Sequence, residues 1–316
     1  MSYHQITSGE RYMISALRKQ GLSLGQVGRE LGRHRSTIGR ELRRNGCRHG
    51  YYRPSVAVTL AVSRRSVSRR NQRFSPTQLR RVEALLVRQW SPEQVAGYLR
   101  RHRELQISHE TIYRHIWKDR RRGGGLHLHL RGARKRRRKR YGSYDSRGRL
   151  AGKRHISERP AACDHRTEIG HWEIDTILGT GSRHCLLSLV DRKTGFLLLG
   201  KLAARTTQAT TDRTIGFVRQ HPRRFATITA DNGTEFHDYD SIERATDVPF
   251  YFATPHHAWE RGTSENTNGL IRQYAPKGRN LARLTPDACT RIASHLNRRP
   301  RKRLGFRTPE ECFYDQ

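Results

Sequence analysis

Residues 171–179 read HWEIDTILG, and two similar runs follow, CLLSLVD at 185–191 and FLLLGKL at 196–202. All three are short, and they are rich in Ile, Leu and Val. Runs of this length and content predict three consecutive β-strands. The C-terminal half of the chain should therefore be built on a sheet.

Helices and strands alternate beyond these three runs. Such an alternation, after consecutive strands, indicates a mixed five-stranded sheet flanked by helices, which is an α/β fold. The sequence predicts a helix at 206–220, strands at 225–230 and 248–253, and two closing helices that begin near Thr263 and Thr285.

Three carboxylates occupy positions that this fold would bring together. Asp175 lies in the first strand, Asp231 directly follows the fourth strand in an Asp-Asn-Gly turn, and Glu265 opens a later helix. Convergent carboxylates repel one another unless hard cations neutralise them, and Mg²⁺ prefers such oxygen ligands. Spacing alone leaves open that Asp231 is an Asx-turn residue and that Glu265 is a helix-start carboxylate.

The net charge of the chain indicates which kind of molecule it binds. Lys and Arg number 63 against 28 Asp and Glu, a formal charge of +35. Self-repulsion on this scale opposes the compact state, so we expect an acidic partner. Nucleic acid is the first candidate and an anionic membrane surface is the alternative. No apolar run approaches about 18 residues and residues 1–10 lack a signal-peptide core, so we expect a cytosolic protein without membrane segments.

The five cysteines lie far apart in the sequence and form no CxxC pair. An odd, scattered set argues against a disulfide framework and against a zinc ribbon. We expect ordinary reduced thiols at Cys47, Cys163, Cys185, Cys289 and Cys312.

The length of 316 residues allows two or three domains of roughly 100–150 residues each. Changes in composition predict an N-terminal helix-turn-helix domain at 1–70, a second helical, helix-turn-helix-like domain at 71–120, a basic linker at 121–160 and an α/β domain with the three carboxylates at 161–316.

The first helical region has the pattern of a helix-turn-helix. Ser23 and Gln26 form a capping-box sequence, Gly32 supplies a turn, and a third helix is predicted from His34 to Asn45. The N-terminal part of such a helix approaches base edges in the major groove, so readout is expected there. A packing module with a solvated basic face is the alternative. The predicted DNA-binding side chains are Arg33, Arg35, Ser36, Thr37, Arg40, Arg43 and Arg44.

A second, weaker pattern of the same kind follows. Ser75-Pro76, Ser91-Pro92 and Ser108 each begin a predicted helix. Either a second DNA-reading module or a dimerisation or spacer bundle fits this pattern. In the first case, the predicted DNA-binding residues are His109, Thr111 and Arg114.

A run of seven basic residues covers positions 134–140. Blocks of like charge do not fold alone, and on DNA they neutralise phosphates and release counterions. We expect a flexible tether that also binds phosphates. The residues assigned to DNA binding in this run are Arg134, Lys135, Arg136, Arg137 and Arg138.

Six stretches, spread over nearly the whole chain, carry a family pattern. They are GRHRSTIGRELRRN (32–45), GHWEIDTILG (170–179), LVDRKTG (189–195), TADNGTEF (229–236), WERGTSENTNGLIRQYAPKG (259–278) and LNRRPRKRLGF (296–306). These stretches resemble the transposases of the IS30 group of bacterial insertion sequences and stand in the order expected for that family. ENTNGLIRQY is the most specific of the matching segments.

The resemblance implies a ribonuclease-H-like catalytic domain with an Asp-Asp-Glu triad. The triad falls on Asp175, Asp231 and Glu265, with 33 residues between the last two, as the family pattern requires. Two Mg²⁺ ions, with Mn²⁺ as an alternative, would then activate water or a 3′-hydroxyl for attack on DNA phosphodiesters. The implied substrate is double-stranded DNA, namely the element's terminal inverted repeats and a target. Because two ends must be joined, we expect a homodimer or larger assembly.

Further predictions concern residues near the triad. Glu173 lies two residues before Asp175, on the same face of the strand, and is an alternative ligand. We take Asp175 as the ligand because the resemblance aligns it, and Glu173 as a supporting residue. Asn266 and Arg272 lie on the helix of Glu265 and are expected to orient it or to contact phosphates, with plain surface polarity as the alternative.

Asp191, at the end of the second strand, is a more distant alternative to Asp175 as metal ligand.

Two positions depart from the family pattern. Ile174 stands where relatives often have Gly, and Ser264 stands where they often have Asn. Neither change removes a proposed metal ligand, although both residues border the site.

The sequence thus predicts a DNA transposase. One alternative is a DNA-binding repressor that keeps a degenerate nuclease-like domain without activity. A second is a nuclease of the same fold that cleaves RNA or RNA–DNA hybrids.

Overall fold

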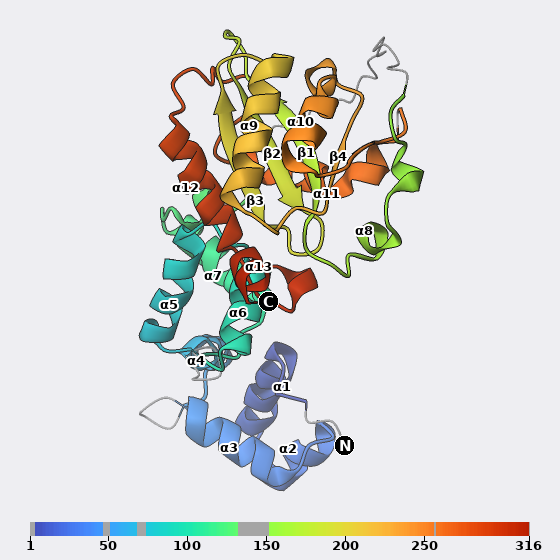
Figure 1. Ribbon diagram of the computed structural model, residues 1–316. Coiled ribbons are helices and arrows are strands. Elements are labelled where there is room, and N and C mark those ends of the chain that lie inside the picture. The colour runs from blue at the N-terminus through green and yellow to red at the C-terminus, as the bar shows by residue number, and fades with distance from the viewer. Residues whose placement is uncertain (1–3, 47–50, 68–73, 132–151, 256, 316) are drawn as a thin grey trace. The chain divides into compact units, whose positions relative to one another are not determined.

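The computed structural model describes residues 4–46, 51–67, 74–131, 152–255 and 257–315. The chain divides into two compact units, Met1–Leu79 and Arg80–Gln316 (Figure 1). The predicted phosphate-binding run at Arg134–Arg138 lies outside the described residues. The four-part division predicted from composition stays a prediction.

Among the described residues, the N-terminal unit is built on helices α1 to α4, and three apolar side chains hold the first three of these together. Ile14, Val27 and Ile38 are fully buried in one cluster. Thr7 and Ser23 begin their helices with capping boxes, which satisfy backbone N–H groups that the helix leaves free. The helices are α1 (Ser8–Lys19), α2 (Leu24–Glu30), α3 (Arg35–Asn45) and α4 (Pro54–Val67).

Three helices that the sequence predicts follow, the first of which spans the boundary between the two units. Ser91 forms a capping box with Gln94, and the Ser108 side chain accepts a hydrogen bond from Thr111 N. The apolar residues at helical spacing are buried. The helices are α5 (Pro76–Val87), α6 (Pro92–Arg101) and α7 (His109–Arg121), followed by the short helix η2 (Leu126–His129).

The mixed five-stranded sheet is present, in the order β3-β2-β1-β4-β5. Strands β1, β2 and β3 pair in antiparallel fashion, whereas β4 and β5 run parallel to β1. The first and fourth strands are neighbours. The strands are β1 (His171–Leu178), β2 (Cys185–Asp191), β3 (Leu197–Leu202), β4 (Thr227–Ala230) and β5 (Phe250–Phe252).

Helices cover both faces of this sheet (Figure 1). Alternate side chains of β1 point to opposite faces, so each face has its own apolar cluster. Trp172 and Ile174 join a buried cluster with residues of α9 and α10. Ile177 joins a second cluster with residues of α11 and α12. Glu173 and Asp175 share the face of Ile177 and therefore lie on the α11 side. These helices are α9 (Thr207–Gln220), α10 (Tyr239–Thr246), α11 (Gly262–Ile271) and α12 (Pro286–Asn297).

Short elements complete the second unit, and its last segment packs against α6. Phe306 lies so close to Gly97 that a Cβ there would be 2.2 Å from the ring. Arg101 pairs with Glu311 at 2.9 Å. The short elements are η3 (Ile156–Glu158), α8 (Ala161–His165), η4 (Thr234–Phe236), η5 (Ala258–Arg261), η6 (Lys302–Leu304) and α13 (Pro309–Tyr314).

Two further predictions can be compared with the described residues. Among these residues, no helix is long and apolar enough to cross a membrane. Cys163, Cys185, Cys289 and Cys312 are free thiols, as expected. Cys47 lies outside the described residues.

Candidate active site

The register of β1 and β4 brings Asp175 and Asp231 to the same level. His171 is paired with Thr227 and Glu173 with Thr229, in parallel. Continuing this register by two residues places Asp231 beside Asp175, just past the end of β4. Both carboxylates keep some contact with solvent, since their side chains are 24% and 30% exposed.

One guanidinium lies between the two carboxylates. Arg261 Nη2 is 3.4 Å from Asp175 Oδ1, and Arg261 Nη1 is 3.1 Å from Asp231 Oδ2. Arg261 Nη2 also donates to the carbonyl oxygen of Ile174 at 2.8 Å. Burial by itself would lower the pKa of Arg261, but the charges of the two aspartates raise it above its ordinary value. Arg261 therefore stays charged and balances the repulsion within the acid pair.

Asn268, on α11, holds the other oxygen of Asp175. Its Nδ2 donates to Asp175 Oδ2 at 2.6 Å, and its Oδ1 accepts from Ser188 Oγ at 3.1 Å. Burial raises the pKa of Asp175 and Asp231 adds to the rise, whereas Arg261 opposes it. The strand that carries Asp175 is thus tied to the helix that carries Glu265.

Glu265 lies in the first turn of α11 with its side chain exposed. Among the described residues, no three His, Cys, Asp or Glu side chains are close enough to hold one metal ion. The Asp175–Asp231 pair suits a hard cation, because carboxylate oxygens from both residues already surround the positive guanidinium of Arg261. Glu265 would have to turn toward the pair to act as a third ligand.

The turn after β4 is held by a buried acid, Glu235. Asp231 Oδ1 accepts from Gly233 N at 2.9 Å. Glu235 is buried, and Arg205 donates to both of its carboxylate oxygens, at 2.8 and 2.6 Å. Thr176 Oγ1, one residue after Asp175, also donates to Glu235, at 2.7 Å. The turn that presents Asp231 is therefore anchored to β1 on the α9 side.

Glu173 is fully buried, and both of its oxygens have partners. Oε1 accepts from Arg192 Nη1, and Oε2 accepts from the backbone N–H of Ser264 at 2.7 Å. Helix α11 has no side-chain cap from the residue that precedes it, Arg261. Glu173 caps this helix from β1 instead, one residue before Glu265. This geometry favours the supporting role predicted for Glu173.

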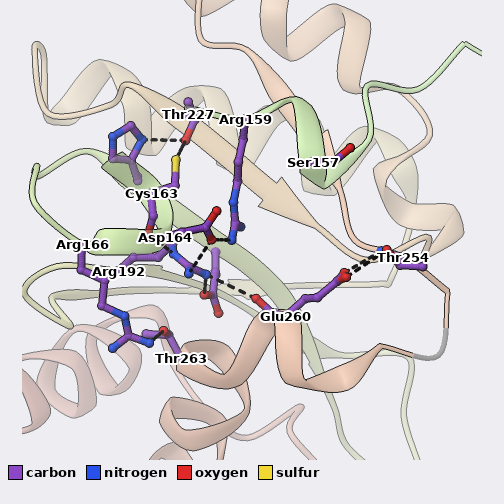
Figure 2. Close-up of polar contacts among 12 residues, drawn as sticks. Ser157, Arg159, Cys163, Asp164, Arg166, Arg192, Thr227, Thr254, Glu260 and Thr263 are labelled. Atoms are coloured by element: carbon purple, nitrogen blue, oxygen red, sulfur yellow. Dashed lines mark hydrogen bonds and ion pairs between the residues drawn. The ribbon is translucent and has the colours of Figure 1, made fainter. Parts of the chain in front are cut away.

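Arg192 connects this cap to α8 and to the loop before α11. Its Nε donates to Cys163 O at 2.9 Å, and its Nη1 donates to Glu260 O at 3.3 Å. Arg192 and Arg159 converge on Asp164 (Figure 2). The Glu260 carboxylate in turn accepts hydrogen bonds from Thr254 N and Oγ1, at 2.8 and 2.9 Å.

Asp191 and the predicted supporting residues Asn266 and Arg272 lie apart from the acid pair. Asp191 is fully buried and accepts from Gly170 N and Thr194 N, so it holds a turn. Asn266 is exposed. Arg272 Nη2 donates to Leu178 O at 3.0 Å and therefore ties the end of α11 to the end of β1. The roles predicted for Asn266 and Arg272 stay predictions.

The predicted DNA-binding residues of the first unit lie on or beside α3. Arg33 is the most engaged of them, because it pairs with Glu10 at 2.9 Å and donates to His4 O. Ser36 Oγ accepts from Arg40 at 3.0 Å. Exposed side chains are those of Arg35, Arg40, Arg43 and Arg44, and half-buried ones are those of Arg33, Ser36 and Thr37.

The predicted residues of the second helical region lie on α7. His109 and Arg114 are exposed, and Arg114 Nη2 donates to Thr111 Oγ1 at 3.3 Å. Tyr113 and Trp117, one turn apart, are also exposed. The helix thus carries a mixed basic and aromatic surface, and its contact with DNA stays a prediction.

Sequence reasoning missed three residues that shape the acid pair. Arg261 lies four residues before Glu265, and Asn268 lies three residues after it, so both share its helical neighbourhood. This spacing from Glu265 was the feature of the sequence from which both residues could have been identified. Glu235 gave none, because an acid in a turn sequence is most often exposed.

Comparisons with known proteins agree with this architecture. Residues 2–45 match a family described as a helix-turn-helix domain. The chain is 39% identical to the transposase for insertion sequence element IS4351 of Bacteroides fragilis, over 99% of this chain and 96% of that one. It is 36% identical to the transposase for IS1086 of Cupriavidus metallidurans, over 97% and 93%. It is 35% identical to the InsI transposase for IS30A of Escherichia coli K12, over 98% and 83%.

A helix-turn-helix domain joined to an α/β unit with an acid pair defines a DNA-binding protein of the transposase class. The identity over nearly the full length shows that the chain belongs to the IS30 family of insertion-sequence transposases.

Proposed function

We propose that this protein binds the terminal inverted repeats of an insertion sequence, cleaves the DNA strands at its ends and joins them to target DNA, with Mg²⁺ as cofactor. The catalytic unit would have a ribonuclease-H-like fold with Asp175, Asp231 and Glu265 as its triad. One observation carries the proposal. Asp175, on β1, and Asp231, just past the end of the parallel neighbour β4, lie at the same level and share one cation, Arg261.

The residues of the chain would hold the reacting groups in place. Asn268 and Arg261 orient the carboxylate of Asp175, and the Gly233 N–H orients that of Asp231. Glu173 fixes the start of α11, so the side chain of Glu265 is delivered from a helix whose position is set by β1. When bound, the metal ions would supply charge neutralisation and an activated oxygen for attack on phosphorus.

DNA would be recognised by the N-terminal unit and held by general charge. The exposed face of α3, with Arg35, Arg40, Arg43 and Arg44, suits the major groove. The net charge of +35 supplies affinity that does not depend on sequence. A dimer or larger assembly on two element ends, located at the nucleoid in the bacterial cytoplasm, is part of the same proposal.

The test uses purified full-length protein, Mg²⁺ and a labelled duplex that carries the terminal repeat of the host element. Wild type is compared with Glu265→Gln for end cleavage and strand joining, and both proteins are assayed for binding in EDTA. We expect the wild type to cut and join, and the substituted protein to bind equally but do neither. Binding without cutting by wild type would instead support the repressor alternative. Preferred cleavage of RNA or hybrid would support the nuclease alternative.

A further inference from the structure

A small cavity adjoins the turn that carries Asp231. It has a volume of about 190 Å³ and is lined by Lys153, Arg154, His155, Asn232, Phe252, Ala253 and Pro255. Three consecutive side chains of basic type thus line one wall, and the residue directly after Asp231 lines another. The chemistry of the wall favours an anion.

Lys153 is the central group of this cavity. Its Nζ donates to Asn232 Oδ1 at 2.9 Å and lies 4.4 Å from the centre of the Phe252 ring. Asn232 is fixed in turn, because its Nδ2 donates to Ala253 O at 2.8 Å. The ammonium is therefore held at a defined position beside the acid pair.

In the part of the chain that the structure describes, no carboxylate in contact with Lys153 matches its charge. Within the described residues, no Asp or Glu oxygen lies within 4.0 Å of its ammonium. The arginines of the same region differ, since Arg154 pairs with Glu243, Arg192 with Glu173 and Arg205 with Glu235.

Burial removes part of the hydration of the Lys153 ammonium. A bound anion would compensate for this loss by pairing with its charge. Burial lowers the pKa of Lys153, and the nearby charge of Asp231 acts in the opposite direction. Lys153 is thus close enough to Asp231 to sense its charge without forming an ion pair with it.

We propose that this cavity is a phosphodiester subsite, in which Lys153 binds a DNA phosphate one or two nucleotides from the phosphate that is attacked. The inference rests on the proposed function and adds a contact to it. A strand that passes the Asp175–Asp231 pair meets Asn232 next and then the Lys153 ammonium. A phosphate there would orient the strand and neutralise the lysine.

The experiment measures binding of full-length protein in EDTA to end duplexes that each carry one uncharged methylphosphonate linkage, within three nucleotides of the cleavage position on either strand. Wild type is compared with Lys153→Gln and Lys153→Arg. The matched control is Lys201→Gln, because Lys201 is a partly buried lysine on β3, at the opposite edge of the sheet, whose Nζ donates to Ala282 O.

We expect one linkage at which the methylphosphonate weakens binding of wild type, of Lys153→Arg and of Lys201→Gln, but not of Lys153→Gln. The strand that carries this linkage identifies which strand occupies the subsite. Loss of one phosphate contact also lowers the salt dependence, so a fourfold rise in salt should weaken wild-type binding about 3-fold more than that of Lys153→Gln.

The subsite is refuted if Lys153→Gln keeps the wild-type sensitivity at every linkage and the full salt dependence. Loss of strand joining with unchanged sensitivity would likewise refute it, because Lys153 would then only hold Asn232. Failure of wild type to prefer end DNA over scrambled duplex would instead contradict the proposed function itself, and the two failures are therefore distinguishable.

Discussion

Replacing Arg192 by Met removes the guanidinium that neutralises the buried carboxylate of Glu173. Glu173 is 0% exposed, and its remaining partner is the backbone N–H of Ser264 at 2.7 Å. Leaving a buried charge without its partner costs about 3–5 kcal/mol. Each kcal/mol shifts the Tm of a unit of roughly 150–250 residues by about 2–4 °C, so we expect a fall of about 6–20 °C for the second unit.

Glu173→Gln should be milder than Arg192→Met. The Gln side chain is neutral, and Arg192 still donates to Cys163 O and Glu260 O after the substitution. The expected loss of stability is about 1–3 kcal/mol, the cost of an imperfectly matched buried hydrogen bond. The double substitution Glu173→Met with Arg192→Met should be more stable than Arg192→Met alone, because apolar residues can replace a buried ion pair.

The assay is urea denaturation of the full-length protein, followed by near-ultraviolet circular dichroism. Wild type, Arg192→Met, Glu173→Met and the double Met variant form a double-mutant cycle, and Glu173→Gln is measured beside them. End cleavage is measured beside it, since loss of the Glu173 cap should displace the start of α11 and with it Glu265. The reasoning would be refuted if Arg192→Met were no less stable than Glu173→Gln. Additive effects of the two Met substitutions would also refute it.

Three further predictions concern separate parts of the chain. Burial lowers the pKa of His171, so its contribution to the free energy of unfolding should be complete above about pH 6.5 and decline as the pH falls toward the lowered pKa. In urea denaturation at a series of pH values, His171→Gln should make the free energy of unfolding depend less on pH over this range, and an unchanged pH dependence would contradict this. Gly233→Ala places a Cβ 2.4 Å from Glu235 Oε2, so we expect end cleavage to fall about 100-fold with DNA binding intact, and normal kinetics would count against the role of the turn. Arg35→Ala should cost about 1–3 kcal/mol in binding to the end duplex but little on scrambled DNA; an equal loss on both would make Arg35 a phosphate contact.

Much of the fold could be predicted from local sequence. Apolar runs predict β1, β2 and β3, and the cap residues Ser23, Ser91 and Ser108 each mark a helix start correctly. These signals succeed because strand and cap preferences act over a few residues. Helix α4 was missed, since its apolar face is less regular.

The surroundings of the acid pair could not be predicted in the same way. Arg261 reaches Asp175 and Asp231 only because η5 and α11 pack beside the sheet. The pairing of Arg192 with Glu173 likewise joins the turn after β2 to β1. Such contacts depend on tertiary packing, so the sequence identifies the acids but not the cations that hold them.

The most direct test of the metal-dependent carboxylate site is Asp231→Cys, assayed for cleavage of the end duplex in Mg²⁺ and in Mn²⁺. Mg²⁺ is a hard cation that binds thiolate poorly, whereas Mn²⁺ tolerates a sulfur ligand better. The account predicts that the substituted protein binds the duplex, is inactive in Mg²⁺ and regains cleavage in Mn²⁺. Undiminished cleavage in Mg²⁺ would contradict it, as would equal inactivity in both metals while DNA binding is retained.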